Sequence, residues 1–181
     1  IIIYLFSLLY AGGNRFILLR SGEVYSYDSN TDTLTAHQSH SFLSDNHPIA
    51  MSYDSESDRV IMVDSDDGDV YSYDYNTDTW TFLQRVPSLS TGDEDIATSY
   101  DSESDRVILV DGDDGNVFSY DYNNDTFTAH QSHPSTNFGG GYPIAMSYDS
   151  ESDRVMLVTG RGGELSSYDY NTDTWTVLQS Y

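Results

Sequence analysis

The chain alternates between short apolar stretches and clusters of turn-forming residues, and no segment keeps a helical period. In the second quarter, four such stretches cover residues 49–53, 59–63, 70–73 and 79–83. Short runs rich in β-branched and aromatic side chains, bounded by Asp, Asn, Ser and Gly, are typical of strands. The pattern therefore predicts four short strands in this quarter and almost no helix in the chain.

The connectors between these stretches have the composition of tight turns. Residues 54–58 read Asp-Ser-Glu-Ser-Asp, and residues 74–78 read Asp-Tyr-Asn-Thr-Asp. Asp, Asn and Ser side chains stabilise turns by hydrogen-bonding to nearby backbone N–H groups. Both connectors are therefore expected to be hairpin turns between antiparallel strands.

Two motifs recur and divide the chain into four units. The motif Ser-Tyr-Asp-Ser-Glu-Ser-Asp-Arg-Val starts at Ser52, Ser99 and Ser147, and a weaker form opens the first unit. A second motif recurs at steps of 46, 47 and 48 residues, with its first Asp at Asp28, Asp74, Asp121 and Asp169. A four-stranded unit of this length cannot bury both faces of its sheet alone, so neighbouring units must stack.

Radial stacking of such sheets produces a β-propeller. The expected fold is all-β, a single propeller domain over residues 1–181 with four blades of four antiparallel strands. The blades are expected at residues 1–43, 44–95, 96–142 and 143–181. Four blades are few for a propeller, so two arrangements remain open. One is a compact ring, and the other is part of a larger propeller completed by missing sequence or by oligomerisation.

The second hairpin of each unit carries a Tyr followed seven positions later by a large apolar residue. Tyr73 precedes Trp80 in this way, and Tyr168 precedes Trp175. This hairpin resembles the kelch repeat, and the resemblance covers essentially the whole chain. It implies a kelch-like β-propeller.

Two features depart from the kelch pattern. The Gly-Gly pair after the second strand is mostly missing, as Asp111-Gly112 and Thr159-Gly160 illustrate. The family includes a copper oxidase whose radical site needs a Cys-linked Tyr. This chain has no Cys, so that chemistry does not carry over.

The charge of the chain limits its partners. Its 181 residues include 30 Asp and Glu but only 7 basic residues, all Arg, for a net charge of −23. Nucleic acid and anionic membranes are therefore excluded as expected partners. A strongly acidic, Lys-free surface stays hydrated in high salt and suggests an extracellular or cell-surface setting. The absence of Cys also excludes disulfides and thiolate metal sites.

The connections at one end of the expected blades vary more than those at the other. The turns within the first and second hairpins hardly change between units, whereas residues 39–48, 85–95 and 132–143 differ greatly. Antiparallel strands place these variable connections, and the loops between second and third strands, at the same end. Variable loops on a constant scaffold favour a binding face. Neutral drift in tolerant loops is the alternative interpretation.

Acidic loops at that end are candidate calcium sites, because hard carboxylate oxygens suit Ca²⁺. The loops lack the full spacing of an EF-hand, so a solvated acidic hairpin is the competing interpretation. The candidate metal ligands are Asp64, Asp66, Asp67, Asp69, Asp111, Asp113 and Asp114.

The same end carries paired histidines and an aromatic, Gly-rich loop. Paired imidazoles can hold Zn²⁺ or Cu²⁺, but residues three apart on a strand point to opposite faces. Duplication of a two-blade unit explains the pairing equally well. The aromatic side chains can stack on a sugar or cap a blade edge. The candidate ligand-face residues are His37, His40, His130, His133, Phe138, Tyr142 and Arg161.

No catalytic motif stands out, and paired carboxylates are too numerous to single out an acid and a base. The expected function is a non-catalytic binding module that uses the variable loops to bind a protein, a glycan or another copy of itself. One alternative is a self-assembling structural protein of an extracellular polymer, with unpaired outer strands in contact. Another is a carbohydrate-acting enzyme that uses loop carboxylates.

Overall fold

The computed structural model describes residues 6–11, 13–20, 22–40, 49–89, 95–135, 143–160 and 162–180. Within these ranges the chain forms sixteen strands and no helix. The strands make four antiparallel sheets of four, each with its strands in chain order. The all-β class and the division into four four-stranded blades are confirmed.

Each sheet is one blade, numbered along the chain. Blade 1 contains β1 (Phe6–Tyr10), β2 (Arg15–Arg20), β3 (Glu23–Asp28) and β4 (Thr33–Ala36). Blade 2 contains β5 (Ile49–Asp54), β6 (Arg59–Asp64), β7 (Asp69–Asp74) and β8 (Thr79–Arg85). Blade 3 contains β9 (Ile96–Asp101), β10 (Arg106–Asp111), β11 (Val117–Asp121) and β12 (Thr126–His130). Blade 4 contains β13 (Ile144–Asp149), β14 (Arg154–Thr159), β15 (Glu164–Asp169) and β16 (Thr174–Ser180).

The hairpin turns are built by two Asp residues with different tasks. In the β5–β6 turn, Asp54 Oδ1 accepts hydrogen bonds from the backbone N–H groups of Glu56 and Ser57, at 3.0 and 3.1 Å. Asp58 ends the turn with φ of 54°, a left-handed conformation that Asp tolerates better than most residues. Its carboxylate accepts a hydrogen bond from the Tyr53 phenol at 2.8 Å. The repeated motif is therefore a turn device that fixes the register of each hairpin.

Each blade turns a different face to each neighbour. We call the face toward the preceding blade the front face, which in blade 2 carries Val60 and Met62. The rear face, toward the following blade, carries Ile61 and Val63. Because side chains alternate along a strand, one continuous apolar run on β6 supplies both faces.

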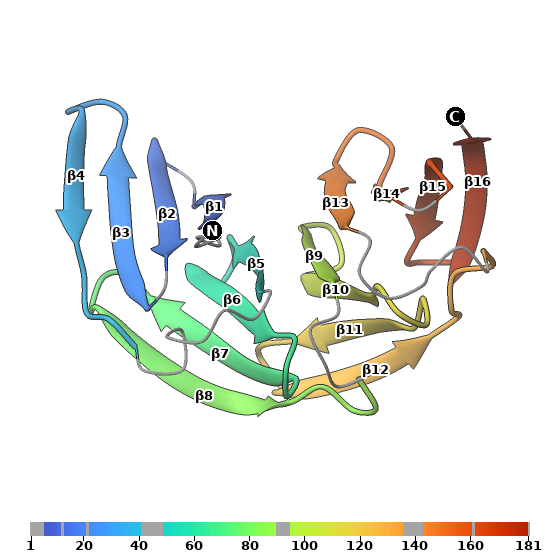
Figure 1. Ribbon diagram of the computed structural model, residues 1–181, viewed down its shortest axis with the longest axis horizontal. Helices are drawn as coiled ribbons and strands as arrows, with labels where there is room; N and C mark the ends of the chain where they lie inside the picture. The colour runs from blue at the N-terminus through green and yellow to red at the C-terminus, as the bar shows by residue number, and fades with distance from the viewer. Residues whose placement is uncertain are drawn as a thin grey trace, which may run out of the picture.

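The four blades stand side by side in chain order and form an open arc (Figure 1). Strands β1, β5, β9 and β13 line its inner side, where β5 packs against both β1 and β9. Blades 1 and 4 stand at the two ends of the arc, so the blades do not close into a compact ring. The arc is the arrangement expected for part of a larger propeller.

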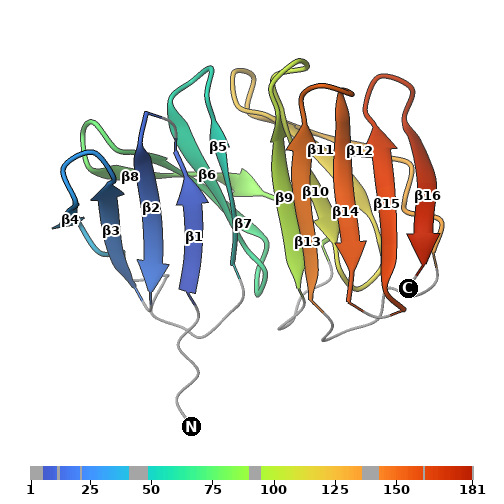
Figure 2. The ribbon, with the colours of Figure 1, turned by 90° about the horizontal axis from the view of Figure 1, so that it is seen from above.

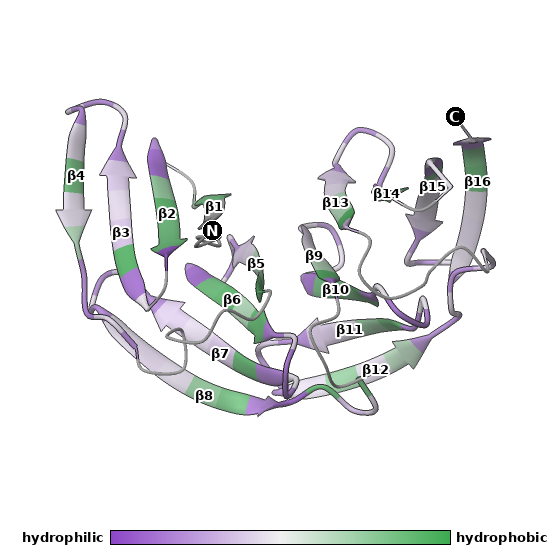
Figure 3. Cartoon of the chain, viewed as in Figure 1, coloured by the Kyte–Doolittle hydropathy of each residue, from purple (hydrophilic) through white to green (hydrophobic). Residues whose placement is uncertain are grey.

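The turns and loops separate to opposite ends of the blades. Figure 2 shows the β5–β6, β13–β14 and β15–β16 turns at one end, and β2 and β14 running toward the other end. The second strand of a blade is apolar along its middle and hydrophilic where the turns begin, as β6 shows in Figure 3. Among the described residues, none forms a helix of the length and apolar character needed to cross a bilayer.

Candidate functional site

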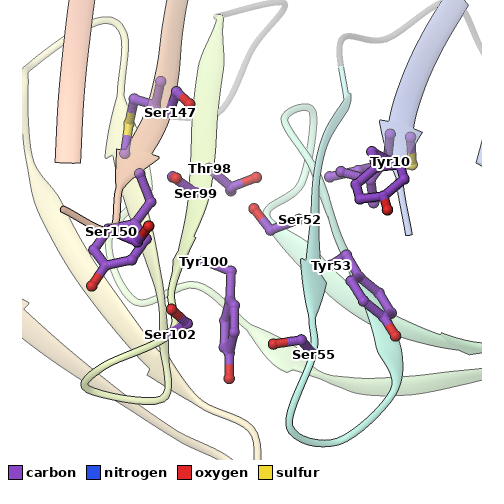
Figure 4. A pocket seen from close by; sticks show the side chains of 14 residues that line it. Tyr10, Ser52, Tyr53, Ser55, Thr98, Ser99, Tyr100, Ser102, Ser147 and Ser150 are labelled. Carbon is purple, nitrogen blue, oxygen red and sulfur yellow. The ribbon is translucent and has the colours of Figure 1, made fainter. Parts of the chain in front are cut away.

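The innermost strands line a groove of about 690 Å³ (Figure 4). This volume lies within the range of small-molecule sites in proteins. β1, β5, β9 and β13 all contribute to it, together with Ser55, Ser102 and Ser150 from the turns that follow the last three. The groove therefore runs along the inner side of the arc and extends toward the end with the constant turns.

At the boundary between β5 and β9, Ser52 points toward blade 3 and Thr98 points toward blade 2. Ser52 pairs across the sheet with Ile61 of the rear face of blade 2, and Thr98 occupies the front face of blade 3. The position of Thr98 is taken by Met51 in blade 2 and by Met146 in blade 4. The boundary between β5 and β9 therefore has two hydroxyl side chains. The β1–β5 and β9–β13 boundaries each have a Met at the position of Thr98.

The two hydroxyl groups are buried without a hydrogen-bond partner in the described part of the chain. Ser52 is 3% exposed and Thr98 is 9% exposed. A buried polar group without a partner costs about 1–3 kcal/mol of stability. Figure 4 shows both side chains at the groove. Because both oxygen atoms are closed to solvent, the two side chains must shift slightly outward before a polar group in the groove can supply the missing bonds.

Tyrosines flank these hydroxyl groups. Burial and the hydrogen bond to Asp58 raise the pKa of Tyr53 to about 12. Burial also raises the pKa of Tyr100 and Tyr148, and each donates a hydrogen bond to the Asp that ends its turn, at 2.9 and 2.8 Å. All three phenols therefore stay protonated at neutral pH and present uncharged aromatic rings.

The fourteen residues that line the groove are Ser, Thr, Tyr, Met and Leu, and none carries a charge. A Ser or Thr hydroxyl needs an adjacent base to act as a nucleophile, and the lining offers no imidazole, carboxylate or amine. Hydroxyl groups and aromatic faces instead suit the binding of a neutral polar ligand.

The structure places the predicted histidines between blades. The His37 Nε2 lies 2.7 Å from Ser26 Oγ. Its ring packs edge-on against Tyr73 and Tyr75 of blade 2, with ring centroids 6.2 and 5.2 Å apart. His130 repeats each of these contacts between blades 3 and 4. Both imidazoles therefore belong to the packing of one blade on the next.

The second histidine of each pair is also packed against the following blade. His133 Nδ1 accepts a hydrogen bond from the Ser135 N–H at 3.1 Å, and its Nε2 lies 3.5 Å from Glu164 Oε1. Burial lowers the pKa of His133 to about 4. Burial likewise lowers the pKa of His40, whose ring lies 6.2 Å from that of Trp80.

The first acidic loop is held by its own turn and by an Arg. Asp64 Oδ1 accepts a hydrogen bond from the Asp66 N–H at 2.9 Å. Arg85 lies 3.3 Å from Asp67 and 2.8 Å from Asp69. Asp64, Asp67 and Asp69, which are predicted calcium ligands, therefore have partners within the blade or its turn.

The second acidic loop repeats the turn without the Arg. Asp111 Oδ1 accepts a hydrogen bond from the Asp113 N–H at 2.9 Å, and Asp114 lies 3.4 Å from Asn116. Across the described ranges, no group of three His, Asp or Glu side chains is placed to hold a metal ion. Calcium binding by these loops stays a prediction.

The groove and the predicted ligand face are different places. None of the four predicted histidines lines the groove, and Phe138, Tyr142 and Arg161 lie outside the described residues. Ser52 and Thr98, which line the groove, were not among the site residues predicted from the sequence. A single signal could have found the second of these, namely a Thr at a position where two other units have Met.

Comparisons with known proteins show the fold. No protein-family model matches the chain, and no curated protein does. The similar solved structures are β-propeller proteins. An auxiliary nutrient binding protein from Bacteroides thetaiotaomicron matches with a TM-score of 0.63 at 14% identity, over 97% of this chain and 40% of that chain.

Two further structures match over similar shares. A chain of a nidogen/laminin complex has a TM-score of 0.70 at 9% identity, over 93% of this chain and 62% of that one. Virginiamycin B lyase from Staphylococcus aureus has a TM-score of 0.66 at 7% identity, over 96% of this chain and 54% of that one. The chain thus spans 40–62% of the length of these three proteins. Such identities show the propeller fold, and the kelch subtype stays a prediction.

Proposed function

We propose that the chain is a non-catalytic binding module that holds a neutral, hydroxyl-rich ligand, a segment of glycan, in the groove of the innermost strands. The observation that carries this proposal is the pair of buried hydroxyl groups on Ser52 and Thr98, which have no partner in the described part of the chain. Sugar hydroxyls both donate and accept hydrogen bonds, so one sugar ring can satisfy both groups.

The rest of the groove supports the same ligand class. Sugar rings present apolar C–H faces, and the phenol rings of Tyr53, Tyr100 and Tyr148 offer flat surfaces for them. The lining is uncharged, and the net charge of −23 disfavours anionic ligands. A neutral oligosaccharide therefore fits better than a phosphorylated or acidic one.

A protein partner bound through the variable loops is the second candidate. One of the similar structures is a nidogen/laminin complex, and loops that vary on a constant scaffold are common sites of protein recognition. Either ligand suits a protein that acts outside the cell or at its surface, and that location is part of the proposal.

Screening on an array of neutral and acidic glycans, followed by calorimetric titration of the best neutral glycan, tests the groove. We expect the S52A/T98V double variant to lose at least tenfold in affinity. Ser65→Ala is the matched control, because Ser65 is also buried without a hydrogen-bond partner among the described residues but does not line the groove. It should bind as the original chain does.

Two results would contradict the proposal. One is a double variant that binds the selected glycan with unchanged affinity, which would move the site away from the groove. The other is a change in the mass or linkage of the glycan after incubation, which would favour the carbohydrate-acting enzyme. Binding of a protein but of no glycan would support the second candidate.

A further inference from the structure

The contact between neighbouring blades has the same composition at every junction. The rear face of blade 1 packs Ile17, Leu19 and Val24 against the front face of blade 2 in one core cluster. The next two junctions repeat this cluster with the corresponding side chains. The contact is heterologous, because a rear face always meets a front face and never another rear face.

A polar contact repeats with the apolar one. At the end of its outermost strand, each of blades 1 to 3 has a Gln that donates a hydrogen bond to the Asp ending the second hairpin turn of the following blade. The bonds run from Gln38 N–H to Asp78 at 3.1 Å, from Gln84 Nε2 to Asp125 at 3.0 Å, and from Gln131 N–H to Asp173 at 3.0 Å.

The front face of blade 1 has the composition of a covered face but lies at the end of the arc. Phe16, Leu18, Tyr27 and Leu34 line a hollow of about 330 Å³ on it. Phe16, Leu18 and Tyr27 are half-buried and Leu34 is 59% exposed, whereas the residues of blade 2 that correspond to the first three are almost completely buried. Those residues are Val60, Met62 and Tyr73, at 2%, 0% and 0% exposure.

The rear face of blade 4 is the opposite end of the arc and carries the complementary set. Met156, Val158 and Leu165 stand where blade 2 has Ile61, Val63 and Val70, and all three are half-buried. Their counterparts in blade 2 are at most 2% exposed. With respect to the described residues, the arc therefore has an uncovered front face at one end and an uncovered rear face at the other.

We propose that these two faces bind each other between two copies of this chain, head to tail. Blade 4 of one copy then packs on blade 1 of the other as blade 3 packs on blade 4 within the chain. The repeated register places the exposed Gln179 of one copy beside the exposed Asp32 of the other. The surface is continuous with an interface that the chain already forms three times, so its occupant is a blade of the same kind.

Head-to-tail contacts close when the last free rear face meets the first free front face. Two copies joined through both ends satisfy this condition and leave no apolar end face in water. We therefore expect light scattering after size exclusion to give twice the chain mass of 20.3 kDa. Sodium chloride should be present, because each copy carries a net charge of −23.

Single-face variants identify the contact. Leu18→Asp places a charge in the apolar front face of blade 1, and Val158→Asp places one in the apolar rear face of blade 4. Each substitution should prevent its face from binding. Each variant alone should give the mass of one chain. A mixture of the two should recover pairs, because the intact rear face of the first can bind the intact front face of the second. Phe82→Asp is the matched control, since Phe82 is 54% exposed on β8 away from both faces, and it should leave the pair intact.

Three results would overturn the proposal: one chain mass at every concentration of the unaltered protein, an assembly that survives both single-face variants, or a mixture that stays at one chain mass. Circular dichroism and thermal unfolding check that each variant folds. If Leu18→Asp does not fold, Leu34→Asp replaces it, because this side chain is already 59% exposed.

Discussion

The phenol of Tyr73 donates a hydrogen bond to Asp78 Oδ1 at 2.9 Å. Asp78 ends the second hairpin turn of blade 2, where it also accepts a bond from the Gln38 N–H of blade 1. One carboxylate therefore ties the buried face of its own blade to the edge of the preceding blade. Blades 3 and 4 repeat the arrangement.

Replacing Tyr73 by Phe tests this connection. Tyr73 is completely buried, and a hydrogen bond to a charged group contributes about 1.5–3 kcal/mol. We expect Tyr73→Phe to lower the free energy of unfolding by about 1.5 kcal/mol in urea denaturation. Tyr120→Phe should cause a similar loss, because the Tyr120 phenol donates the equivalent bond to Asp125 at 2.7 Å. Unchanged stability in both variants would show that the bond does not contribute to the free energy of unfolding and that packing of the ring is sufficient.

The groove should reduce the stability of the free protein. The S52A/T98V double variant removes two buried hydroxyl groups that lack partners in the described chain, and an unsatisfied group costs about 1–3 kcal/mol. We expect the variant to unfold at higher urea concentration, with a gain of about 1 kcal/mol or more. A gain in stability with a loss of ligand binding is typical of residues kept for function.

Ser119→Ala is the opposite control for that experiment. Ser119 is 2% exposed, and its hydroxyl lies 2.7 Å from His130 Nε2. Its removal leaves a buried ring nitrogen without this partner, so we expect a loss of about 1 kcal/mol. A destabilised S52A/T98V variant would show instead that the two hydroxyl groups already have partners in solution.

His133 should give the protein a distinct response to mild acid. Burial lowers its pKa from the ordinary 6.5 to about 4. Between these two pH values the histidine is protonated in the unfolded chain but neutral in the folded chain. The stability linked to this histidine is complete above pH 6.5 and is lost as the pH falls toward 4. The loss is roughly 3 kcal/mol. Urea unfolding between pH 4 and 7 measures it.

His133→Gln isolates this contribution, because a carboxamide does not titrate. The variant should lose less stability between pH 6.5 and 4 than the original chain does, and the loss that remains is assigned to His40 and His130, whose pKa burial also lowers. Hydrogen bonds from Asn76 and Tyr53 lower the pKa of Asp58 from its ordinary value of 3.8. The contribution of Asp58 to stability is therefore lost mainly below pH 4, under the range in which the histidines titrate. An identical pH dependence in the variant and the original chain would contradict the assignment.

Salt should stabilise the fold. With 30 acidic and 7 basic residues, repulsion among carboxylates opposes the compact state, and about 1 M salt screens it within about 3 Å. We expect the melting temperature to rise with sodium chloride at pH 7. The effect should shrink near pH 3, where many carboxylates are protonated. A salt effect of equal size at both pH values would point to a cause other than charge.

Local pattern was enough to predict the strands and turns. The expected strand at residues 59–63 lies within β6, and that at residues 79–83 lies within β8. The Asp pairs of the turns were predictable because their hydrogen bonds join residues two or three positions apart. Ser52 and Thr98 were not predictable in the same way, because their meeting depends on which faces of two separate sheets oppose each other.

The four blades follow from local sequence, since each strand, turn and register depends on side-chain alternation and turn chemistry within about 47 residues. That the blades form an open arc with a groove on its inner side follows instead from how they pack. The angle between neighbouring sheets depends on the summed volumes of all side chains packed between them. No single repeat contains that sum, because each interface is built from two.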